Sequence, residues 1–276
     1  MMAGVLASDG TLLYAEAHGD GVPVLLSCGL CTTHENWRPQ VGPWVAAGLR
    51  VILWDYRGHG RSQAPRDPAA YSMRQVVDDL GRVLAWGAGE RPAVLGGLSF
   101  GGLASLHFAL QEPRRVRALL LIDTGPGFKN PEAQARWEAQ VERTAGFLEK
   151  NGCGAFALSK AAATAIGLRP ELPAAQAAAR AIAAQDPVGL ALFARRVAAV
   201  APPVIDQLAS IEIPALVVVG EKDEPYQRAA EVLASRLPKA ESARIAGAGH
   251  VVNLEEPQVF DAAVLAFLRR VAPPVH

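Results

Sequence analysis

The sequence predicts an α/β protein in which a mostly parallel central sheet is flanked by helices. Short apolar runs, typical of strands buried on both faces, alternate with helix-length segments in the first and last parts of the chain. A glycine-rich turn joins one of these strands directly to a helix, and an alanine-rich block without a clear strand separates the two alternating parts. These three observations predict one sheet whose chain is interrupted by a helical insertion.

The expected strands are apolar runs bounded by turn residues. Gly4–Ser8 and Leu12–Ala17 flank Ser8-Asp9-Gly10 and so predict a hairpin. The later runs predict buried strands, which are, in order, Val22–Cys28, Arg50–Trp54, Pro92–Leu98, Val116–Ile122, Ala215–Gly220 and Glu241–Ala246.

The expected helices lie between these strands. Ser72 is a suitable N-cap for an amphipathic helix through Trp86, and Pro39 is tolerated in the first turn of an earlier one. The predicted helices are Trp37–Ala47, Ser72–Trp86, Ser99–Gln111, Tyr226–Leu237 and Pro257–Val271. In such a sheet, reactive groups gather where parallel strands end.

The alternation stops after Gly125-Pro126-Gly127 and returns at Ala215. Prolines divide the intervening alanine-rich stretch into several helices, at Pro170, Pro173 and Pro187. We expect residues 126–202 to form a helical cap over the strand ends, and residues 1–125 and 203–276 to form the core. Ordinary surface helices without a gating role are the alternative.

Composition excludes several classes of protein. Lys and Arg together number 27, as do Asp and Glu, and no basic block occurs, so nucleic acid is not an expected partner. No apolar run approaches the roughly 18 residues of a membrane helix. The beginning, Met1 to Val5, lacks the features of a signal peptide, and three cysteines do not make a disulfide framework. We therefore expect a cytoplasmic enzyme; its oligomeric state cannot be deduced.

Gly97-Leu98-Ser99-Phe100-Gly101 fits the G-x-S-x-G nucleophile elbow. A strand that runs straight into a helix holds the serine at strained dihedral angles and exposes its Oγ. The flanking glycines have no Cβ, so the strand and the helix can approach each other closely. The helix N-terminus supplies free N–H groups for a negative charge. These features predict that Ser99 is a nucleophile.

A serine nucleophile needs a base and an acid that orients the base. Of the six histidines, His250 lies in a glycine-rich loop between the last strand and the last helix. Asp223 follows the strand Ala215–Gly220. The order Ser99, Asp223, His250, each after its own strand, is that of one hydrolase fold. The other histidines lack a matching acid, and His276 is the last residue.

With these residues in view, the chain resembles the α/β-hydrolase superfamily over nearly its whole length. Its loop Asp55-Tyr56-Arg57-Gly58-His59-Gly60-Arg61-Ser62 is similar to the D-x-R-G-x-G-x-S loop of lid-bearing members. The resemblance implies Ser99 as nucleophile, His250 as base and Asp223 as orienting acid. It also implies an oxyanion hole built from the backbone N–H groups of Leu30 and Phe100.

The chain departs from the superfamily pattern in front of Leu30. The family usually has His-Gly there, whereas this chain has Cys28-Gly29. The expected donor is main chain, so the change need not remove it, but the orientation of the loop is left open.

Several residues have competing interpretations. Asp123 follows the strand Val116–Ile122 and is the alternative orienting acid, and His59 is the alternative base. Arg195 and Arg196 could hold a substrate carboxylate, although a solvated helix face is the favoured interpretation.

Cys28 and Cys31 form a C-x-x-C, which leaves a thiol oxidoreductase as a further hypothesis. Asp55 and Arg57 are expected to fix their loop.

The sequence thus predicts a serine hydrolase that acts on carboxylic esters of small to medium, largely apolar substrates through an acyl-enzyme. The mechanism requires no metal or organic cofactor. Enol-lactone hydrolysis, C–C bond hydrolysis of a diketone and perhydrolysis remain open within the same fold. A hypothesis from another class is a ligand-binding receptor with slow turnover.

Overall fold

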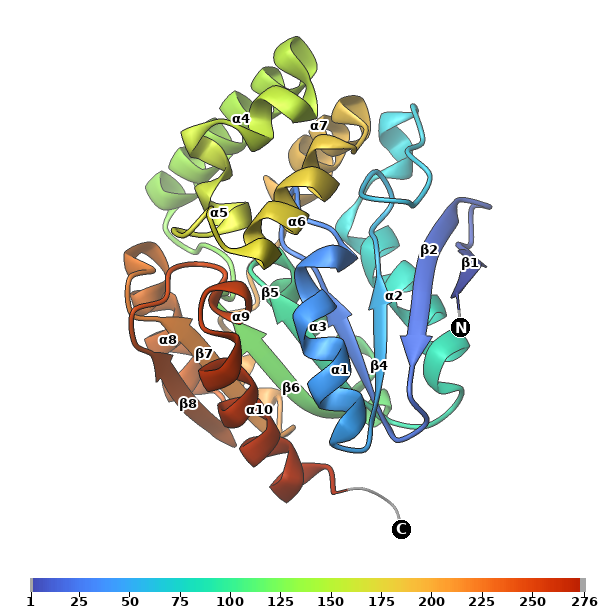
Figure 1. Cartoon of the computed structure of the whole chain (residues 1–276), viewed down its shortest axis with the longest axis vertical. Helices are drawn as coiled ribbons and strands as arrows, with labels where there is room; N and C mark the ends of the chain where they lie inside the picture. The colour runs from blue at the N-terminus through green and yellow to red at the C-terminus, as the bar shows by residue number, and fades with distance from the viewer. Residues whose placement is uncertain (1, 274–276) are drawn as a thin grey trace.

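The computed structural model describes residues 2–273, which form one sheet with helices on both faces and a helical layer above it (Figure 1). Met1 and His276, considered above, lie outside the described residues. The strands are β1 Met2–Leu6, β2 Leu12–His18, β3 Val22–Ser27, β4 Leu49–Trp54, β5 Ala93–Leu98, β6 Val116–Ile122, β7 Ala215–Gly220 and β8 Ala240–Ile245. The predicted α/β-hydrolase fold class is confirmed.

The strand order is β1-β2-β4-β3-β5-β6-β7-β8. β2 pairs antiparallel with β1 and with β4, and every other pairing is parallel. The sheet is therefore mostly parallel, as predicted. β3, β5 and β7 are buried along their entire length, which explains why they are continuous apolar runs.

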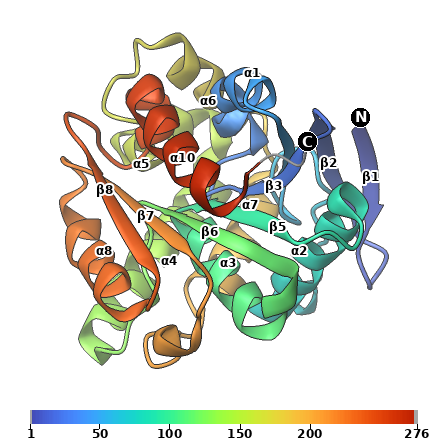
Figure 2. The same cartoon turned by 90° about the horizontal axis from the view of Figure 1, so that it is seen from below.

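The helices of the core divide between the two faces of the sheet (Figure 2). α1 (Arg38–Ala46) packs with α10 (Pro257–Val271) on one face, whereas α2 (Met73–Ala88), α3 (Phe100–Gln111) and α8 (Glu224–Arg236) lie on the other. α2 begins at Ser72, whose side chain accepts a hydrogen bond from the Gln75 N–H, as expected of an N-cap.

The helices between β6 and β7 lie above the carboxyl ends of the strands (Figure 1). They are α4 Pro131–Ala157, α5 Ala163–Ile166, α6 Pro173–Ala183 and α7 Pro187–Phe193, followed by a π-helical turn Ala194–Ala198. Pro173 and Pro187 begin α6 and α7, so prolines divide this block as the sequence suggested. Gly152 kinks α4, with φ of 78°.

Most predicted boundaries agree with the structure to within about two residues, and the following differences are the informative ones. The first strand begins at Met2 rather than Gly4, because its ladder with β2 runs from Met2 opposite Glu16 to Leu6 opposite Leu12. The first helix is preceded by a 3₁₀ turn His34–Trp37, which Thr33 caps. A short helix after His250, α9 Val252–Glu255, was not predicted.

None of the helices within residues 2–273 combines the length and apolar character that crossing a lipid bilayer requires.

Candidate active site

Ser99 stands at the sharp turn between β5 and α3. Its φ is 54°, in the region that residues with a Cβ rarely adopt. A Cβ on Gly101 would lie 2.5 Å from the Ser27 carbonyl oxygen, and one on Gly97 would overlap the backbone of Gly101. Both glycines are therefore required for the strand and the helix to meet at this distance, and the turn has the strained geometry of a nucleophile elbow.

His250 and Asp223 form a buried pair on neighbouring loops. The Nδ1 atom of His250 lies 2.7 Å from Asp223 Oδ2, which leaves Nε2 as the free ring nitrogen. Both residues line the same cavity as Ser99. A second buried pair, His34 with Asp55, has the same 2.7 Å separation, but neither of its members lines that cavity. The two pairs therefore differ in that only His250 and Asp223 line the cavity that contains Ser99.

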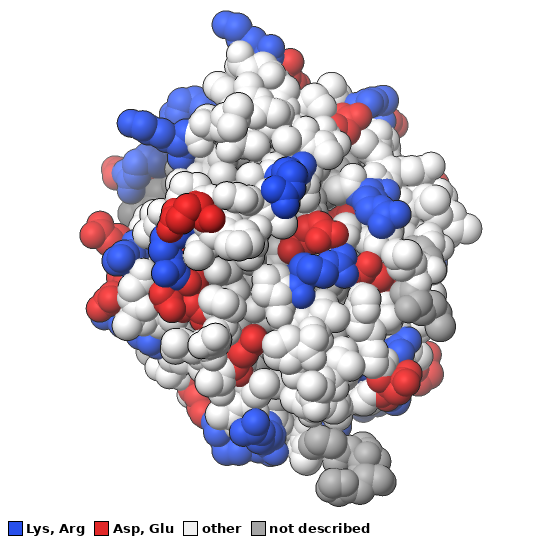
Figure 3. Space-filling view, viewed as in Figure 1, with Lys and Arg blue, Asp and Glu red and all other residues white. Residues whose placement is uncertain are grey.

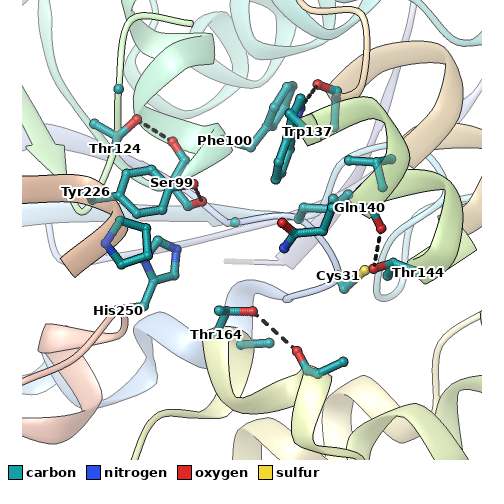
Figure 4. A pocket seen from close by; sticks show the side chains of 18 of the residues that line it. Cys31, Ser99, Phe100, Thr124, Trp137, Gln140, Thr144, Thr164, Tyr226 and His250 are labelled. Carbon is teal, nitrogen blue, oxygen red and sulfur yellow. Dashed lines mark hydrogen bonds between the residues drawn. The ribbon is translucent and has the colours of Figure 1, made fainter. Parts of the chain in front are cut away.

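Tyr226 contacts both Ser99 and His250. Its hydroxyl lies 3.4 Å from Ser99 Oγ, and its ring centroid lies 4.6 Å from that of His250 (Figure 4). Burial raises the pKa of the Tyr226 phenol, so the hydroxyl keeps its proton at neutral pH. Tyr226 was not among the site residues predicted from the sequence. Its position three residues after Asp223, in the first turn of α8, is the signal that could have indicated it.

Asp123 lies beside Asp223 but in a different environment. The ligand atoms of Asp123, Asp223 and His250 lie within 4.8 Å of one another. Asp123 accepts a hydrogen bond from the Gly220 N–H at 2.8 Å, and its Oδ2 has no partner within residues 2–273. Burial raises the pKa of the Asp123 carboxyl well above its usual value, and the charge of Asp223 adds to this effect. Burial thus disfavours the charged form of Asp123, whereas Asp223 carries the bond to His250.

The same three side chains are the group within the described residues that could hold a metal ion. His250 Nδ1 and Asp223 Oδ2 already contact each other, so a cation would have to compete with that hydrogen bond.

The loop that carries Leu30 lies against the serine. A Cβ on Gly29 would lie 3.4 Å from the Cβ of Ser99, and both Leu30 and Phe100 line the cavity. The Leu30 N–H is not used by any other group of residues 2–273, and Phe100 is the first residue of α3, where N–H groups have no partner within the helix. Two free donors therefore lie next to the serine.

The structure shows what orients this loop in the absence of the usual histidine. The Tyr56 hydroxyl donates to the Cys28 carbonyl at 3.0 Å, and the Cys31 N–H donates to His59 Nε2 at 3.3 Å. Gln185, from the inserted helices, donates to the Cys31 carbonyl at 2.8 Å. Side chains from two other segments thus hold this loop, in addition to the weak hydrogen bond from Cys28 Sγ to the Trp54 carbonyl.

His59 belongs to this support and not to the cavity wall. It is buried, and burial lowers its pKa to about 4, so the ring is neutral and can accept a hydrogen bond from the Cys31 N–H.

Asp55 accepts hydrogen bonds from the backbone N–H groups of His34 and Arg61. Arg57 is buried between Asp79 and Asp9, at 2.7 and 2.6 Å. The expectation that Asp55 and Arg57 fix their loop is confirmed.

Cys28 and Cys31 are free and buried. Burial raises the pKa of the Cys28 thiol well above its usual value and that of Cys31 to about 12. A reactive C-x-x-C pair requires the opposite, an accessible thiol with a lowered pKa. The geometry therefore does not favour a thiol oxidoreductase.

The cavity above Ser99 has a volume of about 1160 Å³. Its walls come from the strand ends on one side and from α4 and α5 on the other, with Trp137, Gln140 and Thr144 facing Ser99 across the space (Figure 4). Arg195 and Arg196 do not line it. Arg195 instead pairs with Glu142 at 2.7 Å and with Glu149 at 2.6 Å, which agrees with the favoured interpretation of a solvated helix face.

The fold and this arrangement define a class of protein. The sequence matches the family described as alpha/beta hydrolase fold over residues 22–257, and the chain belongs to that family. The eight-stranded, mostly parallel sheet and the sharp turn between β5 and α3 are the structural counterpart of that match.

Individual relatives are similar over nearly their full length. The RutD protein of Variovorax paradoxus, which bears the name of a carbamate hydrolase, is 32% identical over 95% of this chain and 98% of its own. A thermophilic esterase from Thermogutta terrifontis is 28% identical, with a TM-score of 0.83 over 98% of this chain and 99% of its own. The enol-lactonase from Burkholderia xenovorans LB400 is 25% identical, with a TM-score of 0.78 over 97% and 99% of the two chains.

Proposed function

We propose that this protein is a serine hydrolase that cleaves carboxylic esters through an acyl-enzyme, with Ser99 as nucleophile, His250 as base and Asp223 as orienting acid. The observation that carries the proposal is the 2.7 Å bond from His250 Nδ1 to Asp223 in the cavity where Ser99 stands at the elbow. The esterase and enol-lactonase neighbours agree with it.

In this proposal, His250 Nε2 takes the proton of Ser99 as Oγ attacks the ester carbonyl carbon. The N–H groups of Leu30 and Phe100 stabilise the oxyanion, each contributing about 3 kcal/mol. The protonated imidazole then gives its proton to the alcohol oxygen as the C–O bond breaks. Water, deprotonated by His250, attacks the acyl-enzyme, releases the acid and restores Ser99. Asp223 holds the imidazole tautomer and stabilises its charged form.

Residues 126–202 act in this proposal as the cap that closes the cavity and excludes water. Their α4 and α5 residues supply the wall opposite Ser99, and the apolar side chains of that wall include Trp137, Val141 and Phe156. An acyl or alcohol group of small to medium size fits this environment.

Carbamate hydrolysis is a second candidate, because the full-length relative at 32% identity is named for it. A carbamate presents the same carbonyl carbon to Ser99 but has nitrogen attached to it. Enol-lactones and diketones remain further alternatives, and a receptor would bind a ligand with negligible turnover.

The test is a panel of p-nitrophenyl butyrate, an alkyl carbamate, an enol-lactone and a diketone, assayed with the wild type, Ser99→Ala and Ser105→Ala. Ser105 lies in the same helix, donates to the Gly101 carbonyl and is the matched control. We expect rapid ester turnover with a burst, a loss of up to about a million-fold in Ser99→Ala and little change in Ser105→Ala. Full activity in Ser99→Ala would contradict the proposal.

A further inference from the structure

The lining of the cavity carries positive charge that the proposed chemistry at Ser99 does not use. Three cationic side chains line the wall, namely Arg136, Arg143 and Lys160. Within residues 2–273, the acidic residue that lines the same cavity is Asp223, and its carboxylate is occupied by His250. Apart from Asp223 and its partner His250, the charged side chains that line the cavity are therefore all positive.

These cations are not neutralised by other side chains. Arg143 and Lys160 take part in no ion pair or side-chain hydrogen bond within the described residues. Arg136 has one distant partner, Glu132, at 3.9 Å on the neighbouring turn. Figure 3 shows Lys and Arg side chains gathered over α4, at the upper left of the view.

The charges of α4 are sorted by helix face. Arg136 and Arg143 are seven residues apart, which places them two turns apart on one side of the helix. Glu142 and Glu149, also seven apart, lie on another side, where both bind Arg195. Glu142 and Glu149 are thus committed to Arg195, and Glu132 is the acid of α4 that lies near a cavity cation, 3.9 Å from Arg136.

Neutral hydrogen-bonding groups lie on the same wall. Gln140 faces the cavity and its amide can donate two hydrogen bonds (Figure 4). An ionised carboxylate can only accept hydrogen bonds. Arginine, lysine and the amide nitrogen of glutamine are donors, so these groups are complementary to a carboxylate. The cavity, at about 1160 Å³, exceeds the usual range of about 300–1,000 Å³ for ligand sites and has room for a chain that extends from Ser99 toward these cations.

From these observations, and resting on the proposed ester hydrolysis, we propose that the substrate carries a carboxylate at the end remote from the scissile bond. Arg143 and Lys160 bind that carboxylate, and the apolar wall contacts the chain between the two ends. The substrate class is then a monoester of a dicarboxylic acid, or an ester whose alcohol part is acidic.

The experiment compares two probes of equal shape, mono-p-nitrophenyl adipate and its terminal amide, at low ionic strength. We expect the wild type to prefer the carboxylate in kcat/KM by about tenfold, because each exposed charge pair contributes a few-fold. Arg143→Gln and Lys160→Gln should each lower that ratio about threefold, and the double variant should bring it close to one. Added salt should lower the wild-type ratio in the same direction.

Lys150→Gln is the matched control, because Lys150 is an exposed cation of the same helix that does not line the cavity. Its ratio should equal that of the wild type. A wild-type ratio of one or below, or a ratio that survives in the double variant, would overturn this inference while leaving ester hydrolysis intact. Failure of the wild type to cleave either probe, or cleavage of both by Ser99→Ala, would instead overturn the proposed function.

Discussion

The hydroxyl oxygen of Tyr226 lies 3.4 Å from Ser99 Oγ, while its ring packs against the imidazole of His250 with the two planes tilted by 38°. The proposed nucleophile and base are therefore both in contact with one protonated phenol that also faces the cavity. A donor at this point can interact with Ser99 Oγ when that atom becomes the ester oxygen of an acyl-enzyme.

Tyr226→Phe removes this donor and keeps the ring on His250. Because one hydrogen bond contributes about 1 kcal/mol, we expect kcat for p-nitrophenyl butyrate to fall about five- to tenfold with an unchanged melting temperature. Steady-state kinetics and thermal unfolding provide the measurement. An unchanged or higher kcat would mean that the hydroxyl only packs against the serine.

Asp223→Asn and Asp123→Asn distinguish the two candidate acids. Asp223 holds the imidazole through its charged carboxylate, so its replacement should lower kcat by up to about ten-thousandfold. Burial raises the pKa of the Asp123 carboxyl, and an amide keeps the acceptor for the Gly220 N–H, so Asp123→Asn should stay within about tenfold of the wild type. The reverse ranking of the two variants would assign the orienting role to Asp123.

Gly97→Ala should disrupt the elbow. Its methyl group would overlap the backbone of Gly101, so β5 and α3 would have to separate at a cost of about 1–3 kcal/mol. We expect a lower free energy of unfolding in urea together with a loss of activity. Gly146→Ala is the matched control, since nothing lies within 4 Å of its added Cβ and alanine favours the helix; equal behaviour of the two variants would count against the steric explanation.

The stability of the protein should fall between pH 6.5 and pH 4 because of His59. Its pKa is about 4 in the folded protein and 6.5 ordinarily, so the unfolded chain binds more protons in this interval. The stabilisation is complete above pH 6.5 and is lost as the pH falls toward 4, by at most about 3 kcal/mol. His59→Gln keeps an acceptor for the Cys31 N–H and should flatten this slope in urea unfolding. An identical slope in the variant would exclude His59 as its source.

The thiols should be inert in the folded protein. Cys28, Cys31 and Cys153 are all buried, and burial raises the pKa of each. A coloured disulfide reagent at neutral pH should therefore label all three in urea and none rapidly in buffer. Fast labelling of Cys28 or Cys31, with a loss of ester hydrolysis, would favour a functional role for the C-x-x-C pair.

The local sequence determined the sheet and the elbow. Buried parallel strands require continuous apolar runs, so Val24 to Leu26 and Leu119 to Ile122 could be identified without tertiary information. Gly97 and Gly101 could be understood in the same way, because the close approach of strand and helix admits no Cβ. These are properties that neighbouring residues impose on one another.

Only the tertiary structure decided which distant groups meet. His34 with Asp55 and His250 with Asp223 have the same separation, and only the second pair opens onto the cavity of Ser99. The contact of Tyr226 with Ser99 joins residues 127 positions apart, and Arg143 and Lys160 line the cavity only because the inserted segment folds over the strand ends. Such contacts depend on how whole elements pack against each other, and no short-range pattern along the chain records that packing.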